Sequence, residues 1–292
     1  MKIIAILLGM FLITQFIGLY VVNHYSDEDN KLPYGMETPR IEKERDFYTI
    51  FPSIIIAFVI AVGLLFLLNR FNVAFILKLW FFVVVVIALS ISFNSVLNKF
   101  GYSMIIASII ALPLAFVKVY KRDFLIHNIT ELFIYPGIAA VFVPILNVGT
   151  IILFLIFISI YDMWAVWKSG IMQKMAKYQI EKLNIFGGFF VPYLPKKTKL
   201  KLQKMKKSEM KKKKVKVNLA ILGGGDVIFP IIAAGIMFVR FGLVSALLVT
   251  LGATLGLSYL FFFSKKEKFY PAMPFITTGI FLGMIVGYLI RL

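Results

Sequence analysis

The stretch that decides the fold is VNLAILGGGDVIFPIIAAGIMF, residues 217–238, in which Asp226 is the only charged residue. A helix that crosses the hydrocarbon core of a bilayer needs about 20 predominantly apolar residues. A charged side chain near the centre of that core costs roughly 2.5–3.5 kcal/mol. We therefore interpret residues 217–238 as a membrane span whose aspartate is retained for a function.

The rest of the chain has the same apolar character. Hydrophobic residues make up 60% of the 292, and the mean hydropathy is +0.90, whereas soluble domains are about 45–50% apolar. Such an excess predicts an all-α, polytopic membrane protein. Nine stretches are long and apolar enough to be spans, at residues 3–22, 49–68, 72–93, 102–120, 124–143, 147–167, 217–238, 242–263 and 271–290.

The residues that are missing or scattered exclude several classes of site. The chain has no cysteine, which excludes disulfides, zinc–thiolate and iron–sulfur sites, and a cysteine nucleophile. The two histidines, His24 and His127, lie far apart and show no metal-ligand spacing. We therefore expect no metal and no cofactor.

The net charge of +18 indicates topology and anionic lipid rather than nucleic acid, because most basic residues lie in loops between the apolar spans. The side that holds the N-terminus carries about 24 of them, about 16 within residues 168–216, against about seven on the other side. This bias predicts a cell-membrane protein with the N-terminus and the 168–216 loop in the cytoplasm and the C-terminus outside. Residues 196–216 are mostly lysine, and we expect them to be mobile and to lie near anionic headgroups.

Three acidic residues fall well inside predicted spans: Glu131, Asp162 and Asp226. Lys78 is the only basic residue deep in a span, so ion pairing explains one acid at best. The two aspartates lie on consecutive, antiparallel spans, roughly 9 and 13 Å from the cytoplasmic surface, so they are expected to face each other. Glu131 has a similar depth, and a packing or helix-end role is favoured for it over a third polar group at the site.

Two carboxyl groups at close range share one proton and titrate as a pair. The ionised partner then takes a proton from water while the other protonates a carbonyl oxygen, which is the chemistry of aspartic proteases. Paired intramembrane acids also mark the ion paths of transporters, but we see no internal repeat of the transporter kind. A lipid-binding scaffold built on the lysine run would leave the aspartates unexplained.

Glycines and prolines flank these positions. Gly223, Gly224 and Gly225 precede Asp226, although each glycine costs a helix about 1 kcal/mol relative to alanine. They indicate either close approach of a neighbour or a local break in the helix. The last span opens with Pro271-Ala272-Met273-Pro274, which fits ordinary prolines of a first helical turn or an irregular backbone that faces a water-filled cavity.

These residues together resemble a known family. Tyr161-Asp162 looks like the YD motif of the presenilin and signal peptide peptidase family, and Gly223-Gly224-Gly225-Asp226 fits its GxGD motif. Pro271-Ala272-Met273-Pro274 resembles its PAL motif, with methionine where leucine is usual. The nine spans, the order of the motifs and the long loop also agree, and the short chain is similar to archaeal members.

The resemblance implies a single transmembrane protease domain over residues 1–292 with Asp162 and Asp226 as catalytic residues. It also implies roles in shaping the site or binding substrate for Tyr161, Gly223, Gly224, Gly225, Pro271, Ala272, Met273 and Pro274. The enzyme would be an intramembrane aspartic endopeptidase that hydrolyses single-span membrane proteins or remnant signal peptides.

Further expectations follow from the same resemblance. The substrate would be held as an extended strand, and Phe189–Pro195 and Val215–Val217 would supply strands that pair with it. The cytoplasmic N-terminus resembles presenilin, because signal peptide peptidase has the reverse orientation. The sequence leaves open whether the protein forms a homo-oligomer.

Overall fold

The structure is a computed structural model that describes residues 2–27, 29–37, 41, 44–69, 74–100, 102–121, 123–169, 187–193, 218–264 and 270–290. Each of the nine predicted stretches contains an apolar helix, which confirms the all-α, polytopic fold class. The helices are α1 (Lys2–Ser26), α2 (Glu44–Asn69), α3 (Ala74–Leu97), α4 (Ser103–Phe116), α5 (Phe124–Phe142), α6 (Val148–Trp164), α10 (Gly224–Phe241), α11 (Leu243–Phe263) and α12 (Met273–Leu289).

Two of these helices continue as π-helical turns, and two short 3-10 turns lie in the connections. The π turns are η2 (Val117–Lys121) after α4 and η4 (Ala165–Ser169) after α6. The 3-10 turns are η1 (Pro33–Gly35) and η3 (Val143–Ile145). Seven of the described segments are long and apolar enough to cross a membrane, and α2 and α12 include shorter apolar stretches.

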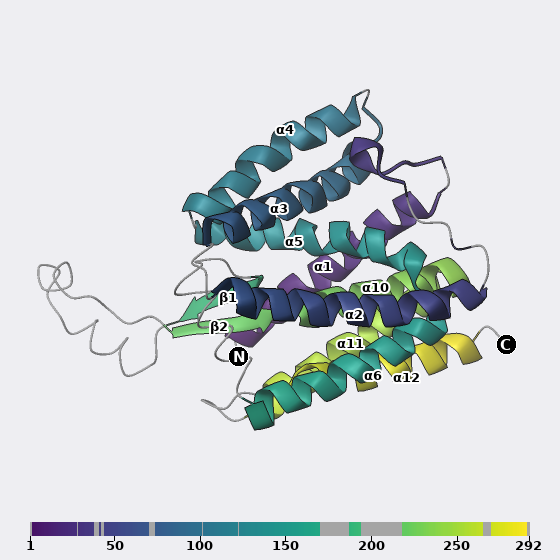
Figure 1. Ribbon diagram of the computed structural model, residues 1–292. Helices are drawn as coiled ribbons and strands as arrows, with labels where there is room; N and C mark the ends of the chain where they lie inside the picture. The colour runs from purple at the N-terminus through teal and green to yellow at the C-terminus, as the bar shows by residue number, and fades with distance from the viewer. Residues whose placement is uncertain are drawn as a thin grey trace, which may run out of the picture.

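The helices form one bundle whose two ends differ (Figure 1). The C-terminal end of the chain lies at one end, and the N-terminal end of α1 lies at the other. Helices α3, α4 and α5 form one side of the bundle, α6, α11 and α12 form the other, and α1 and α10 run between them. The α11–α12 contact is close because an added Cβ on Gly252 would strike the backbone of Gly279, a small-residue packing common between membrane helices.

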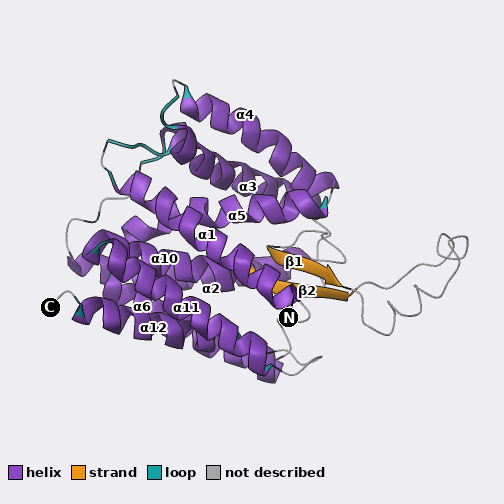
Figure 2. Cartoon of the chain, turned by 180° about the vertical axis from the view of Figure 1, so that it is seen from behind, coloured by secondary structure: helices purple, strands orange, loops and turns teal. Residues whose placement is uncertain are grey.

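A two-stranded antiparallel sheet lies at the end of the bundle that holds the N-terminus (Figure 2). Strand β1 (Gly188–Tyr193) pairs with β2 (Asn218–Gly223), with Gly188 opposite Gly223 and Tyr193 opposite Asn218. The prediction of a helix from residue 217 was therefore wrong for its first residues. The segment before the three glycines finds a strand partner, and α10 begins only at Gly224.

Two parts of the predicted 168–216 loop belong to elements that the structure describes. Residues 168–169 belong to η4, and residues 188–193 form β1, which overlaps the strand expected at Phe189–Pro195. This strand pairs with β2, and its pairing with substrate stays a prediction. The lysine-rich segment 196–216 and the predicted strand at Val215–Val217 lie outside the described residues.

Candidate active site

Asp162 lies in the last turn of α6, and its side chain is buried. Its Oδ2 atom accepts a hydrogen bond from the backbone N–H of Met273 at 3.0 Å. Met273 is the first residue of α12, where backbone N–H groups have no partner within the helix. The start of α12 therefore supplies a fixed donor to the first aspartate.

The Pro271–Pro274 segment both starts a helix in the ordinary way and contributes a backbone group to the site. Ala272 is the N-cap residue of α12 and Pro274 lies in the first turn, where a missing N–H costs nothing. The prolines thus have an ordinary helix-start position. The backbone N–H of Met273, between the two prolines, has no partner within the helix and donates to Asp162. The Pro271–Pro274 segment therefore lies at the first aspartate.

Asp226 lies in the first turn of α10, directly after strand β2. Its Oδ2 atom lies 3.2 Å from the point where a Cβ on Gly223 would be. A carboxylate in this turn is favoured by the unpaired N–H groups and by the helix dipole. Helices α6 and α10 contact each other, so the elements that carry the two aspartates are neighbours.

The three glycines before Asp226 are not equivalent. A Cβ on Gly224 would lie 2.8 Å from the hydroxyl oxygen of Tyr135 and 2.9 Å from its ring, whereas a Cβ on Gly225 would meet only Phe229, at 3.6 Å. Gly224 is therefore required by the close approach of α5. Gly225 has ordinary room for a side chain.

Tyr161 borders the site on the adjacent face of α6. Its side chain is half-buried, and its ring centroid lies 6.3 Å from that of Trp164. The Asp162–Met273 contact does not include it. Tyr161 is thus placed beside the first aspartate.

Sequence reasoning missed two polar contacts close to the aspartates. The hydroxyl of Ser159 donates a hydrogen bond of 2.9 Å to Thr277 Oγ1, one turn from Asp162 and from Met273. The amide of Gln15 in α1 donates a 3.0 Å bond to the carbonyl oxygen of Val227, the residue after Asp226. A sequence signal for the pair of Ser159 and Thr277 does exist. Each is a polar residue inside a span, one helical turn from a motif residue.

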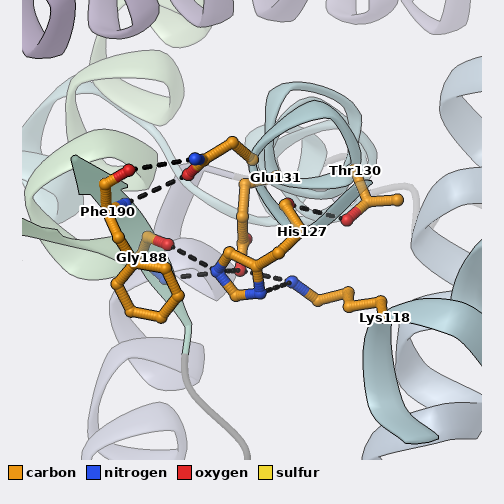
Figure 3. Close-up of polar contacts among 7 residues, drawn as sticks. Lys118, His127, Thr130, Glu131, Gly188 and Phe190 are labelled. Atoms are coloured by element: carbon orange, nitrogen blue, oxygen red, sulfur yellow. Dashed lines mark hydrogen bonds and ion pairs between the residues drawn. The ribbon is translucent and has the colours of Figure 1, made fainter. Parts of the chain in front are cut away.

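Glu131 has a partner that the sequence did not suggest (Figure 3). Its Oε1 atom lies 2.5 Å from Lys118 Nζ and 3.4 Å from His127 Nε2, and all three side chains are buried. The assignment of Lys118 to the basic loops was wrong, because it lies near the end of the apolar segment Ser103–Lys121 and is buried against Glu131. The π turn η2 carries Lys118 back against α5, where only 4% of it is exposed.

Comparisons with known proteins agree with this arrangement. The family model described as signal-peptide peptidase, presenilin aspartyl protease matches residues 8–291. Two similar solved structures are those of a presenilin family intramembrane aspartate protease in space groups C222 and P2. The first is 18% identical with a TM-score of 0.62 and covers 98% of this chain and 99% of its own. The second is 20% identical with a TM-score of 0.61, and the coverage is 97% and 96%. No curated protein sequence matches the chain.

Proposed function

The chain belongs to the signal-peptide peptidase and presenilin aspartyl protease family, and from this premise we propose that Asp162 and Asp226 are its catalytic pair. The protein is an intramembrane aspartic endopeptidase, a multi-pass protein whose substrates lie in the lipid bilayer. The observation that carries the assignment is the bond from Met273 N–H to Asp162, because it joins two of the three motifs at one point. Asp226, in the first turn of the contacting helix α10, adds the third.

The proposed reaction uses the shared proton of the pair. The ionised carboxylate takes a proton from a water molecule, whose oxygen attacks the peptide carbonyl carbon, while the protonated carboxyl group donates its proton to the carbonyl oxygen. The tetrahedral intermediate then breaks its C–N bond, and the leaving nitrogen receives a proton from the pair. The N–H of Met273 stabilises the ionised form at Asp162.

We propose that the substrate binds along the edge of strand β2 that faces away from β1. Backbone groups of Gly188 and Phe190 in β1 are bonded to side chains of α5, and Pro192 has no N–H. Because alternate residues of a strand face opposite edges, β1 uses its other residues to pair with β2. Among the residues that the structure describes, the free edge of the sheet is therefore that of β2.

This edge leads directly to the second aspartate. The outward-facing backbone groups of β2 belong to Leu219, Ile221 and Gly223, and α10 begins at the next residue. A substrate that unwinds and adds as a third strand would have its backbone held in register beside Asp226. We propose single-span membrane proteins or remnant signal peptides as this substrate class.

Cleavage of a single-span peptide by the purified protein in detergent or liposomes tests the catalytic pair. Asp162→Ala and Asp226→Ala are each expected to abolish cleavage. Asp123→Asn is the matched control, because Asp123 caps α5 through Ile126 N–H and asparagine caps equally well. Cleavage that persists in either aspartate variant overturns the assignment.

We also propose that the N-terminus and the basic loop face the cytoplasm. The two termini lie at opposite ends of the bundle (Figure 1), and the excess of basic residues on the N-terminal side supports this orientation. Because the chain lacks cysteine, Lys121→Cys and Asp29→Cys can be labelled one at a time in intact cells. An impermeant maleimide should label only the second, and the reverse pattern would invert the topology.

The basic loop is proposed to lie near anionic headgroups. Deletion of residues 199–213 should weaken binding to anionic vesicles and leave cleavage in detergent mostly intact. Equal vesicle binding with and without the segment contradicts this role.

A further inference from the structure

One face of α5 bonds to the backbone of β1 as a neighbouring strand would. Asn128 uses both ends of its amide group: Nδ2 donates to the carbonyl oxygen of Phe190 at 2.9 Å, and Oδ1 accepts from Phe190 N–H at 3.0 Å. Two residues earlier in β1, the carbonyl oxygen of Gly188 bonds with His127 Nε2 at 2.8 Å, and Gly188 N–H donates to Glu131 Oε1 at 3.3 Å. Both residues on the inner edge of β1, which faces α5, that carry an N–H and a carbonyl oxygen are thus bonded to α5.

Lys118 completes this contact from a second element (Figure 3). Its ammonium group reaches both Glu131 Oε1, at 2.5 Å, and His127 Nδ1, at 3.3 Å. With Nε2 donating to Gly188, Nδ1 of a neutral imidazole is left as the acceptor for Lys118. The cation neutralises Glu131, so the carboxylate can stay buried while it accepts from the backbone of β1.

The same face of α5 also contacts the start of α10. Tyr135, one turn beyond Glu131, packs its ring edge-on against Phe189 of β1 with 5.8 Å between centroids. Its hydroxyl occupies the space that a side chain on Gly224 would need. The position of β1 and the position of the second aspartate are therefore set against one rigid helix.

We infer that His127, Asn128 and Glu131, with Lys118, form a clamp that holds the sheet in place so that the free edge of β2 presents the substrate to Asp226. They are positioning residues, and none of them touches the reacting atoms. A two-stranded hairpin alone is marginally stable, and here the clamp takes the place of a third strand on the inner edge. This inference rests on the strand addition proposed above for the outer edge.

The test compares two substrates in three variants. The substrates are a single-span peptide and the same peptide N-methylated at the amides that would pair with β2. Asn128→Leu removes both bonds to Phe190 at nearly constant volume. Thr130→Val is the matched control, because Thr130 is buried on the same helix and bonds only within α5, to the carbonyl oxygen of His127.

The clamp predicts a selective loss. Asn128→Leu should lower kcat/KM about tenfold for the parent peptide, as expected for two lost hydrogen bonds, and should leave the weaker cleavage of the methylated peptide unchanged. Thr130→Val should change neither. Asn128→Ser, which keeps one hydrogen-bonding group, should fall between. An equal loss on both substrates, or no loss on either, overturns the inference.

Amide exchange separates failure of the clamp from failure of the strand addition. Deuterium uptake in residues 187–193 should rise in Asn128→Leu and stay at the wild-type level in Thr130→Val. If the wild-type enzyme cleaves both peptides equally, the strand addition is wrong, and the clamp is then judged by this exchange alone. Unchanged exchange in Asn128→Leu overturns the clamp.

Discussion

The protein buries carboxyl groups in two neighbouring regions and surrounds them differently. Glu131, in the clamp, has Lys118 at 2.5 Å and a backbone N–H from β1. Asp162 has the backbone N–H of Met273. In the part of the chain that the structure describes, the ion pair inside a span joins Lys118 to Glu131, and the neutral imidazole of His127 lies 3.4 Å from the same carboxylate.

This difference separates structure from chemistry. A buried carboxylate beside a cation stays ionised and holds its neighbours in place, which suits the clamp. A pair of carboxyl groups with no cation has to share a proton, and only such a pair can both take and give protons. In the described part of the chain, Lys118 is paired with Glu131 and neither aspartate takes part in an ion pair, which fits these two roles.

The largest expected effect comes from removing the proton chemistry alone. Asp226→Asn should lower the rate of cleavage by about 10²–10⁴-fold or more, because an amide cannot exchange protons with water or substrate. The free energy of unfolding should stay the same or rise, since a buried carboxyl group without a cation is removed. Single-turnover cleavage in liposomes and thermal unfolding measure the two quantities, and cleavage within tenfold of wild type contradicts the comparison.

In the clamp, removal of a charged group is expected to lower stability. Lys118→Met leaves Glu131 buried without its cation and should lower the free energy of unfolding by about 3–5 kcal/mol. The double variant Lys118→Met/Glu131→Gln should recover most of that loss, because no charge is left unpaired. Unfolding in mixed micelles measures both. If the double variant is as unstable as the single one, the ion pair is not what Lys118 contributes.

The sequence predicted the nine apolar helices and placed the two aspartates on helices that contact each other, α6 and α10, because both results depend on local properties. These are the length of an apolar run and the depth of a charge within it. It did not predict that residues 218–223 form a strand, because the run before the glycines is apolar enough for either element. The partner strand, residues 188–193, lies beyond the lysine-rich segment. Only tertiary structure brings the two together.

The clamp was missed for a related reason. Lys118 lies at the end of an apolar run, where a lysine ordinarily reaches the headgroups. The π turn η2 instead directs it inward. Tyr135 looks like any other aromatic residue of a span, and its importance depends on Gly224, which is remote in the sequence.

A third prediction concerns the contact between α5, which carries the clamp, and α10, which carries Asp226. Gly224→Ala places a methyl group 2.8 Å from the hydroxyl oxygen of Tyr135, whose side chain is buried, and should lower the free energy of unfolding by about 1–3 kcal/mol. Gly225→Ala is the matched control. Its Cβ meets Phe229 at an ordinary 3.6 Å, so alanine should be neutral or stabilise α10 by up to about 1 kcal/mol. Equal losses in the two variants would mean that helix flexibility, rather than contact with α5, selects glycine at position 224.

The smallest effect is expected at the neutral contact between α6 and α12. Thr277→Val removes the acceptor of the Ser159 hydroxyl and should cost about 0.5–1.5 kcal/mol of unfolding free energy. Thr278→Val is the matched control, because the exposed Thr278 bonds only to the carbonyl oxygen of Pro274 in its own helix. Thermal unfolding and kcat are measured together.

A modest loss of stability with a clear fall in kcat for Thr277→Val, and neither change for Thr278→Val, would indicate that this bond aligns Asp162 with the start of α12. The catalytic region would then be held by neutral hydrogen bonds. A charged tie at this position would pair with one aspartate and fix it in the ionised form, whereas a hydroxyl pair aligns the helices and leaves the proton free to move between the two carboxyl groups.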